Sequence, residues 1–331
     1  MNSVLNNHSN MVRTTRAGFT LVELAIVMFI IAMLFVFTMP VSTSLLNNQR
    51  RDITKIKMKT VEAALANYVA VHKRLPCPAD GASTAGVELR AGAIINGVAA
   101  DFTVDCAANT GTPANTNQQT GVVPWVTLGL TRADVLDGWE NQMTFRVAFG
   151  LTQANALDMS ACDPAGTADT TPSGVSPLPP VNTVINVNVC NAALTCTGTG
   201  TACSKPQMFL ANKGFTVVDG ADLKILDPSI YTGAAYILIS HGDNGVGAFT
   251  NSQLLLTSPL IGANGPLEAL NHNNGHGVLS TSTTIFPKFR DAGQSFASGT
   301  AATDAVYFDD LIIRPTVFSL IQRAQLGPRS H

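Results

Sequence analysis

The sequence predicts an α+β protein in which a long N-terminal helix packs on a C-terminal domain of antiparallel β-sheet with loop insertions. Residues 19–39 are apolar except for Glu23, and a helix of these 21 residues spans roughly 30 Å, the thickness of a hydrocarbon core. Helical periodicity continues to His72, and short alternating segments typical of strands come later. These observations together predict the α+β class.

The apolar run predicts a membrane-spanning helix over residues 19–39. An ordinary cleaved secretory signal has a shorter apolar region, so that reading is disfavoured, whereas a plain single-pass anchor remains an alternative. A carboxylate at the bilayer centre costs about 2.5–3.5 kcal/mol, and less near an interface. Glu23 therefore indicates a function that involves a nearby cation.

Residues 18–24 read Gly-Phe-Thr-Leu-Val-Glu-Leu, which resembles the processing site of type IV pilins and type II secretion pseudopilins. The resemblance implies that a prepilin peptidase cuts between Gly18 and Phe19 and methylates the new amine. It also implies that Glu23 pairs with the terminal ammonium of a neighbouring subunit. Pro40 falls where many pilins have a helix-kinking proline. Other pilin or pseudopilin subunits are then the expected partners.

Charge counting and the processing motif disagree about orientation. The leader, residues 1–18, has Arg13 and Arg16, but five basic residues lie within positions 50–59, beyond the membrane helix. We follow the motif, which acts on a cytoplasmic leader, and the downstream cysteines, which suit an oxidising compartment. The expected location is the inner membrane, single-pass, with an extracytoplasmic C-terminal domain that stands in an extracellular or periplasmic filament if the chain assembles.

After Pro40 the pattern indicates an amphipathic helix that packs on the globular domain. It ends where prolines 76 and 78 begin an extended segment, so we expect one long helix over residues 19–74. The polar face carries Arg50, Arg51, Lys55, Lys57, Lys59 and Glu62. The predicted apolar face consists of Leu45, Leu46, Ile53, Ile56, Val61, Leu65, Tyr68 and Val69.

The globular domain is expected over residues 75–331, with an irregular loop region at 78–121 and a Gly/Thr/Pro-rich insertion at about 162–205. Six cysteines without a CxxC pair favour disulfides over metal ligation, although they allow 15 pairings. We expect Cys77 and Cys106 to form one bridge. The disulfide candidates are Cys77, Cys106, Cys162, Cys190, Cys196 and Cys203.

We expect β-strands in three later segments, and three further segments are less regular strand candidates. Residues 137–147 alternate after a turn and resemble the Asp-Pro-Trp-Gly-Asn segment of major pseudopilins, with Gly138 for proline and Glu140 for glycine. Residues 236–240 and 307–313 also read as strands. Residues 93–95, 101–104 and 184–189 are weaker candidates, and the segment 248–303 has low helix-forming content.

Residues 240–245, Ser-His-Gly-Asp-Asn-Gly, and the late acidic segment resemble the end of the major pseudopilin, where a loop binds calcium. Here Asn244 stands where the family has aspartate, with Asp243 one residue early. The alternative is an Asp-Asn-Gly hairpin turn with a solvated acidic strand end, which we favour slightly. The candidate calcium ligands are Asp243, Asn244, Asp304, Asp309 and Asp310.

No residue pattern predicts an enzyme. His272 and His276 would share a metal-binding face only on a helix, and their Gly- and Asn-rich context predicts a polar loop instead. A triad of Ser240, His241 and Asp243 fails because adjacent strand residues point to opposite faces. Phosphate-loop and dinucleotide patterns are missing, and a formal net charge of −2 gives no basic excess for nucleic acid.

The resulting hypothesis is a structural subunit of a type IV pilus or type II secretion pseudopilus, assembled through its N-terminal helix. A mature chain of 313 residues is bulkier than a repeating pilin, which favours a minor subunit. The first alternative is a membrane-anchored extracytoplasmic binding or adhesion protein that does not assemble. An anchored enzyme is the third.

Overall fold

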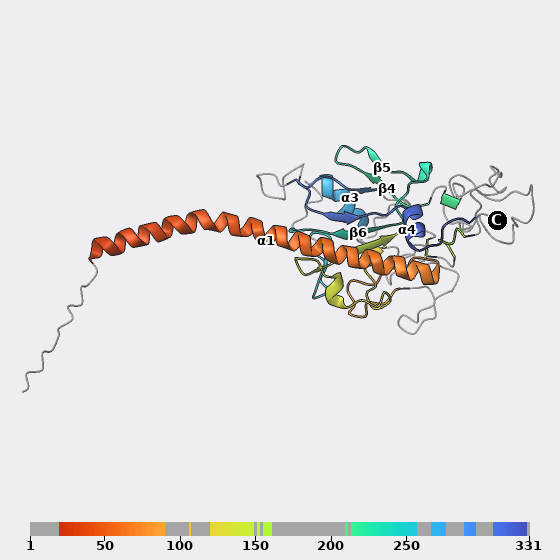
Figure 1. Ribbon diagram of the computed structural model, residues 1–331, viewed down its shortest axis with the longest axis horizontal. Coiled ribbons are helices and arrows are strands. Elements are labelled where there is room, and N and C mark those ends of the chain that lie inside the picture. The colour runs from red at the N-terminus through yellow and green to blue at the C-terminus, as the bar shows by residue number, and fades with distance from the viewer. Residues whose placement is uncertain are drawn as a thin grey trace, which may run out of the picture. The chain divides into compact units, whose positions relative to one another are not determined.

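The computed structural model describes ten stretches of the chain, which divides into two compact units, Met1–Asn48 and Gln49–His331 (Figure 1). Within these stretches the side chains of 35–44, 120, 266 and 273–275 are not described. The described stretches are residues 20–89, 106, 120–148, 151–152, 155–160, 209–210, 213–256, 266–275, 288–295 and 307–329.

The first helix, α1, runs from Leu21 to His72 and confirms the predicted long helix. It is continuous through Pro40. It ends because Lys73 adopts a left-handed conformation, with φ of 57°, and donates its amide to the carbonyl of Val69. Pro76 then cannot continue a helical hydrogen-bond ladder.

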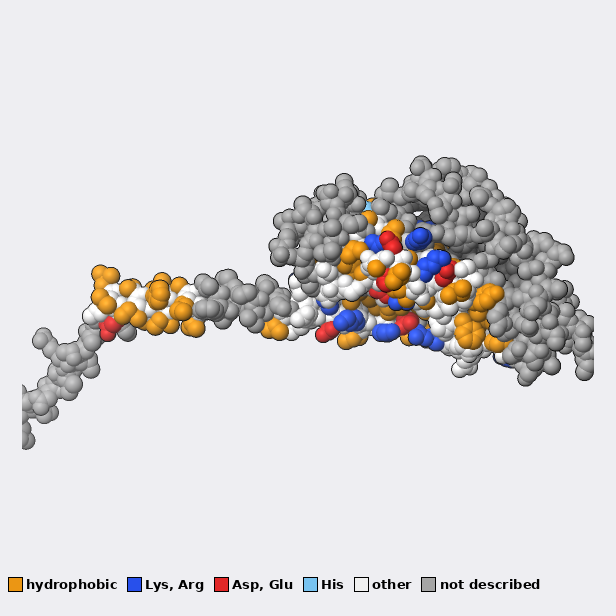
Figure 2. Space-filling view, turned by 90° about the horizontal axis from the view of Figure 1, so that it is seen from above, with side chains coloured by type: hydrophobic (Ala, Val, Ile, Leu, Met, Phe, Trp, Pro, Cys, Tyr) orange, Lys and Arg blue, Asp and Glu red, His pale blue; other side chains and the backbone are white. Residues whose placement is uncertain are grey.

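In the first unit the described side chains of α1 are almost all apolar and exposed (Figure 2). Leu21, Phe29 and Leu34, for example, are 86%, 70% and 59% exposed. Among the residues whose side chains are described, no helix combines the length and the apolar character needed to cross a membrane.

In the second unit α1 buries a different stripe from the predicted one. Val61, Leu65, Tyr68 and Val69 are buried as expected, together with Met58. Of the other residues assigned to the apolar face, Ile53 and Ile56 are exposed, and this part of the prediction was wrong. Leu45 and Leu46 belong to the first unit and are exposed there. The buried face of α1 in the second unit also includes the polar residues Arg51, Thr54 and Glu62.

Three further residues of α1 are buried: Thr54, which was not assigned to the core, and Glu62 and Arg51, which were expected on the polar face. The Thr54 hydroxyl donates to the carbonyl of Arg50 and accepts from the amide of Gly138. Glu62 pairs with Lys59 on α1 and with Arg323. The charge of Arg51 interacts with those of Asp309 and Asp310.

The main sheet has the strand order β1-β3-β6-β9, and every neighbouring pair is antiparallel. All five residues of β6 are buried, so both faces of this central strand are covered. The strands are β1 Thr120–Val122, β3 Thr144–Val147, β6 Tyr236–Ser240 and β9 Leu311–Ile313.

A second sheet has the order β5-β4-β8 and includes a parallel pair, β4 with β8, which the antiparallel prediction did not contain. A two-stranded sheet joins β2 to β7. Its strands and those of the second sheet are β2 Asn141–Gln142, β4 Thr216–Val218, β5 Lys224–Leu226, β7 Phe249–Thr250 and β8 Lys288–Arg290. The remaining helices are η1 Arg132–Val135, η3 Pro228–Ile230, α3 Pro266–Gly275 and α4 Val317–Arg323.

The strand predictions had mixed outcomes. The strand at 236–240 is confirmed as β6, and the alternating segment 137–147 divides into β2 and β3. The last strand begins only at Leu311, because the amide of Asp309 donates to Glu268 and the backbone of Phe308 pairs with Ser295. The candidates at 93–95, 101–104 and 184–189 lie outside the described residues.

One continuous apolar core joins α1, the main sheet, the second sheet and α4 in the second unit. Phe145 and Tyr236 pack at the centre of the main sheet, and Phe215, just before β4, meets Phe289 of β8 edge to face at 5.2 Å between ring centroids. Leu320 and Ile321 of α4 complete the cluster. The α+β class is therefore confirmed.

Candidate functional site

The N-terminus of α1 is closed by a reciprocal pair of residues. The amide and hydroxyl of Thr20 each donate to Oε2 of Glu23 at 2.9 Å, and the Glu23 amide donates to the Thr20 hydroxyl at 3.3 Å. This is a capping box, in which each side chain satisfies the other's backbone amide. Glu23 therefore has a role within its own helix, which the Thr-x-x-Glu pattern of the sequence could have revealed. Gly18 and Phe19 lie outside the described residues.

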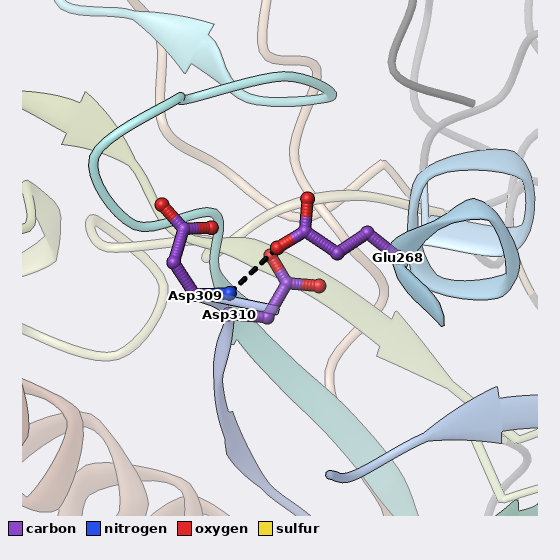
Figure 3. Close-up of side chains that lie close together, drawn as sticks. All are labelled: Glu268, Asp309 and Asp310. Carbon is purple, nitrogen blue, oxygen red and sulfur yellow. Dashed lines mark hydrogen bonds between the residues drawn. The ribbon is translucent and has the colours of Figure 1, made fainter. Parts of the chain in front are cut away.

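A second site is a cluster of three buried carboxyl groups, Glu268, Asp309 and Asp310, which we call the acidic cluster (Figure 3). One oxygen of each lies within 4.8 Å of one oxygen of the others. Glu268 reaches in from the first turn of α3, and Oε1 accepts the Asp309 amide at 2.7 Å. Both aspartates directly precede β9. The cluster thus joins two segments that are distant in sequence.

The turn after β6 encloses Asp309. The amides of Asp243 and Asn244 donate to its Oδ2 at 2.7 and 3.1 Å, and the Tyr307 hydroxyl donates to the same oxygen at 2.9 Å. Gly242 has φ of +59°, and a Cβ there would lie 2.5 Å from Asp309 Cγ. Only glycine therefore lets the turn approach this carboxylate.

The surroundings of the acidic cluster disfavour the ionised forms of Glu268 and Asp309. Burial, followed by the charge of Asp310, raises the pKa of Glu268 to about 10, and burial raises the pKa of Asp309. The charge of the buried Arg51 interacts with those of Asp309 and Asp310, and Nδ1 of His241 lies 3.4 Å from Asp310 Oδ1. Such a cluster is stabilised by taking up a proton or a cation.

One oxygen in the cluster has no hydrogen-bond partner among the described residues. Asp309 is fully buried, its Oδ2 accepts three hydrogen bonds, and its Oδ1 accepts none. An unsatisfied buried carboxylate oxygen costs free energy comparable to a lost hydrogen bond, so it needs an explanation. A cation bound to Oδ1 would be such an explanation.

The turn at 137–141 connects this region to α1 within the second unit. Asp137 accepts the amides of Trp139 and Asn141 and the hydroxyl of Ser240. Trp139 donates its indole N–H to Oδ1 of Asp243 at 2.9 Å. Gly138 lies so close to α1 that a Cβ would meet the Arg50 carbonyl at 2.3 Å. The segment that resembled a pseudopilin motif thus contacts both α1 and the end of β6 with the turn that follows it.

The structure brings together part of the predicted calcium set. Asp309 and Asp310 belong to the acidic cluster, whereas Asp243 and Asn244 contact it mainly through backbone amides and Asp304 lies outside the described residues. Sequence reasoning missed Glu268. The alternative of a hairpin turn with a solvated strand end was wrong, because β6 does not pair with β7 and both aspartates are buried.

The prediction of a loop around His272 was also wrong, because His272 lies on α3. The helix begins Pro-Leu-Glu-Ala-Leu, with proline at its first position and strong helix formers after it, a signal that could have been recognised. Asn271 fixes the helix by hydrogen bonds with the backbone of Arg290 and with Asp310. His276 lies outside the described residues.

The expected bridge between Cys77 and Cys106 is present, with their Cα atoms 5.6 Å apart. It joins the segment after α1 to a residue buried beside Thr152. The other four cysteines, Cys162, Cys190, Cys196 and Cys203, lie outside the described residues, so disulfides among them stay a prediction.

Comparison with known families gives one match: residues 13–39 fit the prokaryotic N-terminal methylation motif. This stretch contains Gly18, Phe19, Thr20 and Glu23. The searches of curated proteins and of solved structures gave no match.

Proposed function

We propose that this chain, which carries the type IV pilin and pseudopilin signature in residues 13–39, is a minor subunit of a type IV pilus or type II secretion pseudopilus. The single observation that carries the proposal is this motif at the head of a helix of 52 residues. The α+β unit that follows supports it. Its size favours a minor role, at a tip or in a priming complex.

In this proposal prepilin peptidase removes residues 1–18, and Phe19 becomes the methylated N-terminus. The apolar surface of α1 in the first unit then lies in the inner membrane, with the second unit extracytoplasmic. Glu23 pairs with the terminal ammonium of a neighbouring subunit, which sets the axial register during assembly. The role is structural, with no catalytic step and no nucleic-acid partner.

The decisive measurement is the intact mass of the chain purified from cells that contain prepilin peptidase. The expected mass is that of residues 19–331 with one added methyl group. Replacing Gly18 by a bulky residue, as in Gly18→Val, should leave the leader attached while the anchor still inserts. A mature mass from that variant, or an unprocessed wild-type chain, would contradict the proposal.

A membrane-anchored binding or adhesion protein that never assembles is the competing function. Its basis is the Gly/Thr/Pro-rich sequence at about 162–205, since such sequences often form the surface loops that carry recognition. Crosslinking distinguishes the two. An assembling subunit forms specific crosslinks to partner pilins through α1, and an isolated anchored protein does not.

We also propose that the acidic cluster holds a calcium ion. The donor set is suitable, because calcium prefers oxygen ligands and the cluster contains three carboxyl groups and an unpartnered Asp309 oxygen. Asp309 and Asp310 would hold the ion, which would neutralise their buried charge. Calcium, but not an equal concentration of magnesium, should then raise the melting temperature.

A further inference from the structure

We infer that the exposed face of α1 in the second unit is a docking surface for an acidic amphipathic helix of a different protein chain. This surface, which we call the α1 seam, consists of the exposed residues Ile53, Ile56, Thr60, Ala63 and Asn67. It lies outside the segment that is proposed to span the membrane, so it adds a contact of stated chemistry to the proposed function.

The spacing of the seam residues favours a helix as the partner. They recur every three or four positions, so they lie along one face of α1, opposite the face on which Met58, Val61 and Leu65 are buried in the core. An alternation of three and four is the pattern by which two helices pack side by side. From Ile53 to Asn67 the seam is roughly 20 Å long, which is about four helical turns.

The shape of the α1 seam leaves room for such a helix. Ile53 and Ile56 are 47% and 67% exposed although both side chains are large and apolar. Thr60 and Ala63 line two shallow hollows of about 560 and 480 Å³, and the second hollow extends beyond α1 to Leu128. Small side chains at these two positions let another helix approach closely. A partner helix would thus cover exposed apolar side chains and fill both hollows.

The charge beside the seam points to an acidic partner. Residues 50–62 contain five basic and two acidic side chains. Exposed basic residues border the seam on both sides, with Lys55 and Lys59 on one side and Arg50 on the other. A helix with glutamate or aspartate beside its apolar stripe would therefore meet a complementary surface along its whole length.

Ion pairs within the chain leave most of this positive charge unbalanced. Lys55 pairs with Asp52 at 3.4 Å, but both side chains are exposed and such a pair is weak. Glu62 is shared between Lys59 and Arg323. A second copy of the chain would bring like charges together at the seam, so a different chain is the better occupant.

Peptide binding to the mature full chain in detergent tests the inference. The probe is a synthetic helix of three heptads, with leucine at the two apolar positions and glutamate beside them, and its control carries lysine in place of glutamate. By fluorescence anisotropy, the wild type should bind the acidic peptide about 10-fold or more tightly than the basic one. Raising the salt from about 50 mM to about 500 mM should weaken this binding several-fold.

Two variants locate the binding on the α1 seam. Ile56→Glu puts a charge into the apolar stripe and should weaken binding of the acidic peptide about 10-fold or more. The double variant Arg50→Glu/Lys55→Glu should reverse the preference, so that the basic peptide binds more tightly. Ile230→Glu is the matched control, because Ile230 is 64% exposed and lies on η3, and it should bind as the wild type does. All these positions are exposed, so unchanged melting temperatures should accompany each result.

The contrary results identify the other possible occupants. Equal binding of both peptides by the wild type, or undiminished binding by Ile56→Glu, would overturn the inference. Self-association in sedimentation that Ile56→Glu abolishes would overturn it in favour of a second copy. Binding to vesicles of anionic phosphatidylglycerol without binding to the acidic peptide would overturn it in favour of a lipid surface. The pilin proposal depends on none of these outcomes, because its decisive test is the intact mass.

Discussion

Glu23, at the start of α1, has a role in helix capping and a proposed role in subunit pairing. Thr20 and Glu23 bond each other, so Glu23 stabilises its own helix whether or not a neighbouring subunit is present. A glutamine at position 23 keeps the shape and can still accept from Thr20, but it carries no charge. The two roles of Glu23 can therefore be tested by different substitutions.

We expect Glu23→Gln to insert and to be processed normally but to lose crosslinks to partner pilins, because a neutral amide cannot pair with a terminal ammonium. Processing and crosslinking should be measured in the same cells. Thr20→Ala is the control, since it removes the hydroxyl of the capping box and keeps the carboxylate. Wild-type crosslinking by the Gln variant would show that Glu23 is not the assembly contact.

The carboxylate of Glu88 should make the stability of the second unit depend on pH. Its carboxylate accepts two bonds from Arg74, one from Tyr68 and one from the Cys77 amide. Burial opposes ionisation, but the Arg74 hydrogen bonds and charge outweigh it, so the pKa of Glu88 is lowered. A lowered folded-state pKa gives stability that is present above the unfolded value and lost as pH falls through the folded one.

Glu88→Gln should therefore destabilise the second unit by about 2–3 kcal/mol at pH 7. The difference from the wild type should shrink as the pH falls below the unfolded-state pKa of about 4.3, because the unfolded carboxylate of Glu88 then takes up a proton before the folded one does. Denaturation between pH 3 and 8 measures it. Asp52→Asn breaks an exposed ion pair with Lys55 and should change stability by less than about 0.5 kcal/mol. A difference that is constant with pH would contradict the role given to the charge.

At the level of elements, the contact between α1 and the turn at 137–141 depends on one missing side chain. A Cβ on Gly138 would lie 2.3 Å from the Arg50 carbonyl oxygen, which belongs to a helix backbone that cannot easily yield. Gly138→Ala should cost about 1–3 kcal/mol of stability. Thermal unfolding measures it, and Gly293→Ala is the control, since nothing lies within 4 Å of a Cβ there. Equal melting temperatures for the two variants would show that the turn does not need this close approach.

The elements also show how far the sequence could predict the fold. The extent of α1 was predictable, because its apolar run, helical periodicity and proline stop are local signals. The buried face of α1 was not predictable, because it depends on the shape and polarity of the sheet and turns that pack against the helix. Thr54 is buried since Gly138 donates to it, whereas Ile56 is exposed, and neither fact follows from hydropathy.

The candidate site was only partly predictable for the same reason. Asp309 and Asp310 were identified from a local resemblance at the end of the chain's sheet. Glu268 was missed because its distance from Asp309 is a property of the tertiary structure, set by the packing of α3 on β8 through Asn271. The α3 helix itself was missed because the Gly- and Asn-rich residues after it were given more weight than its Pro-Leu-Glu-Ala-Leu start.

At the scale of the whole molecule, the Cys77–Cys106 bridge constrains the chain just after α1. Replacing both cysteines by serine should lower stability by about 2–4 kcal/mol, because the unfolded chain regains the freedom that the bridge removes. Chemical denaturation measures the loss. Thiol labelling of the denatured, unreduced wild type should find no reactive thiol among the six cysteines. Two or more labelled thiols would argue against an oxidising compartment.

The ion pair between Glu62 and Arg323 joins residues 261 positions apart. The same neighbourhood places Leu320 and Ile321 of α4 in the core with Val61 and Leu65 of α1. Contacts over such separations form late, because a long loop must close first. In the proposed function this unit is exported, so its core cannot close until α4 has crossed the membrane. Until then the incomplete apolar core is exposed to extracytoplasmic proteases and to aggregation.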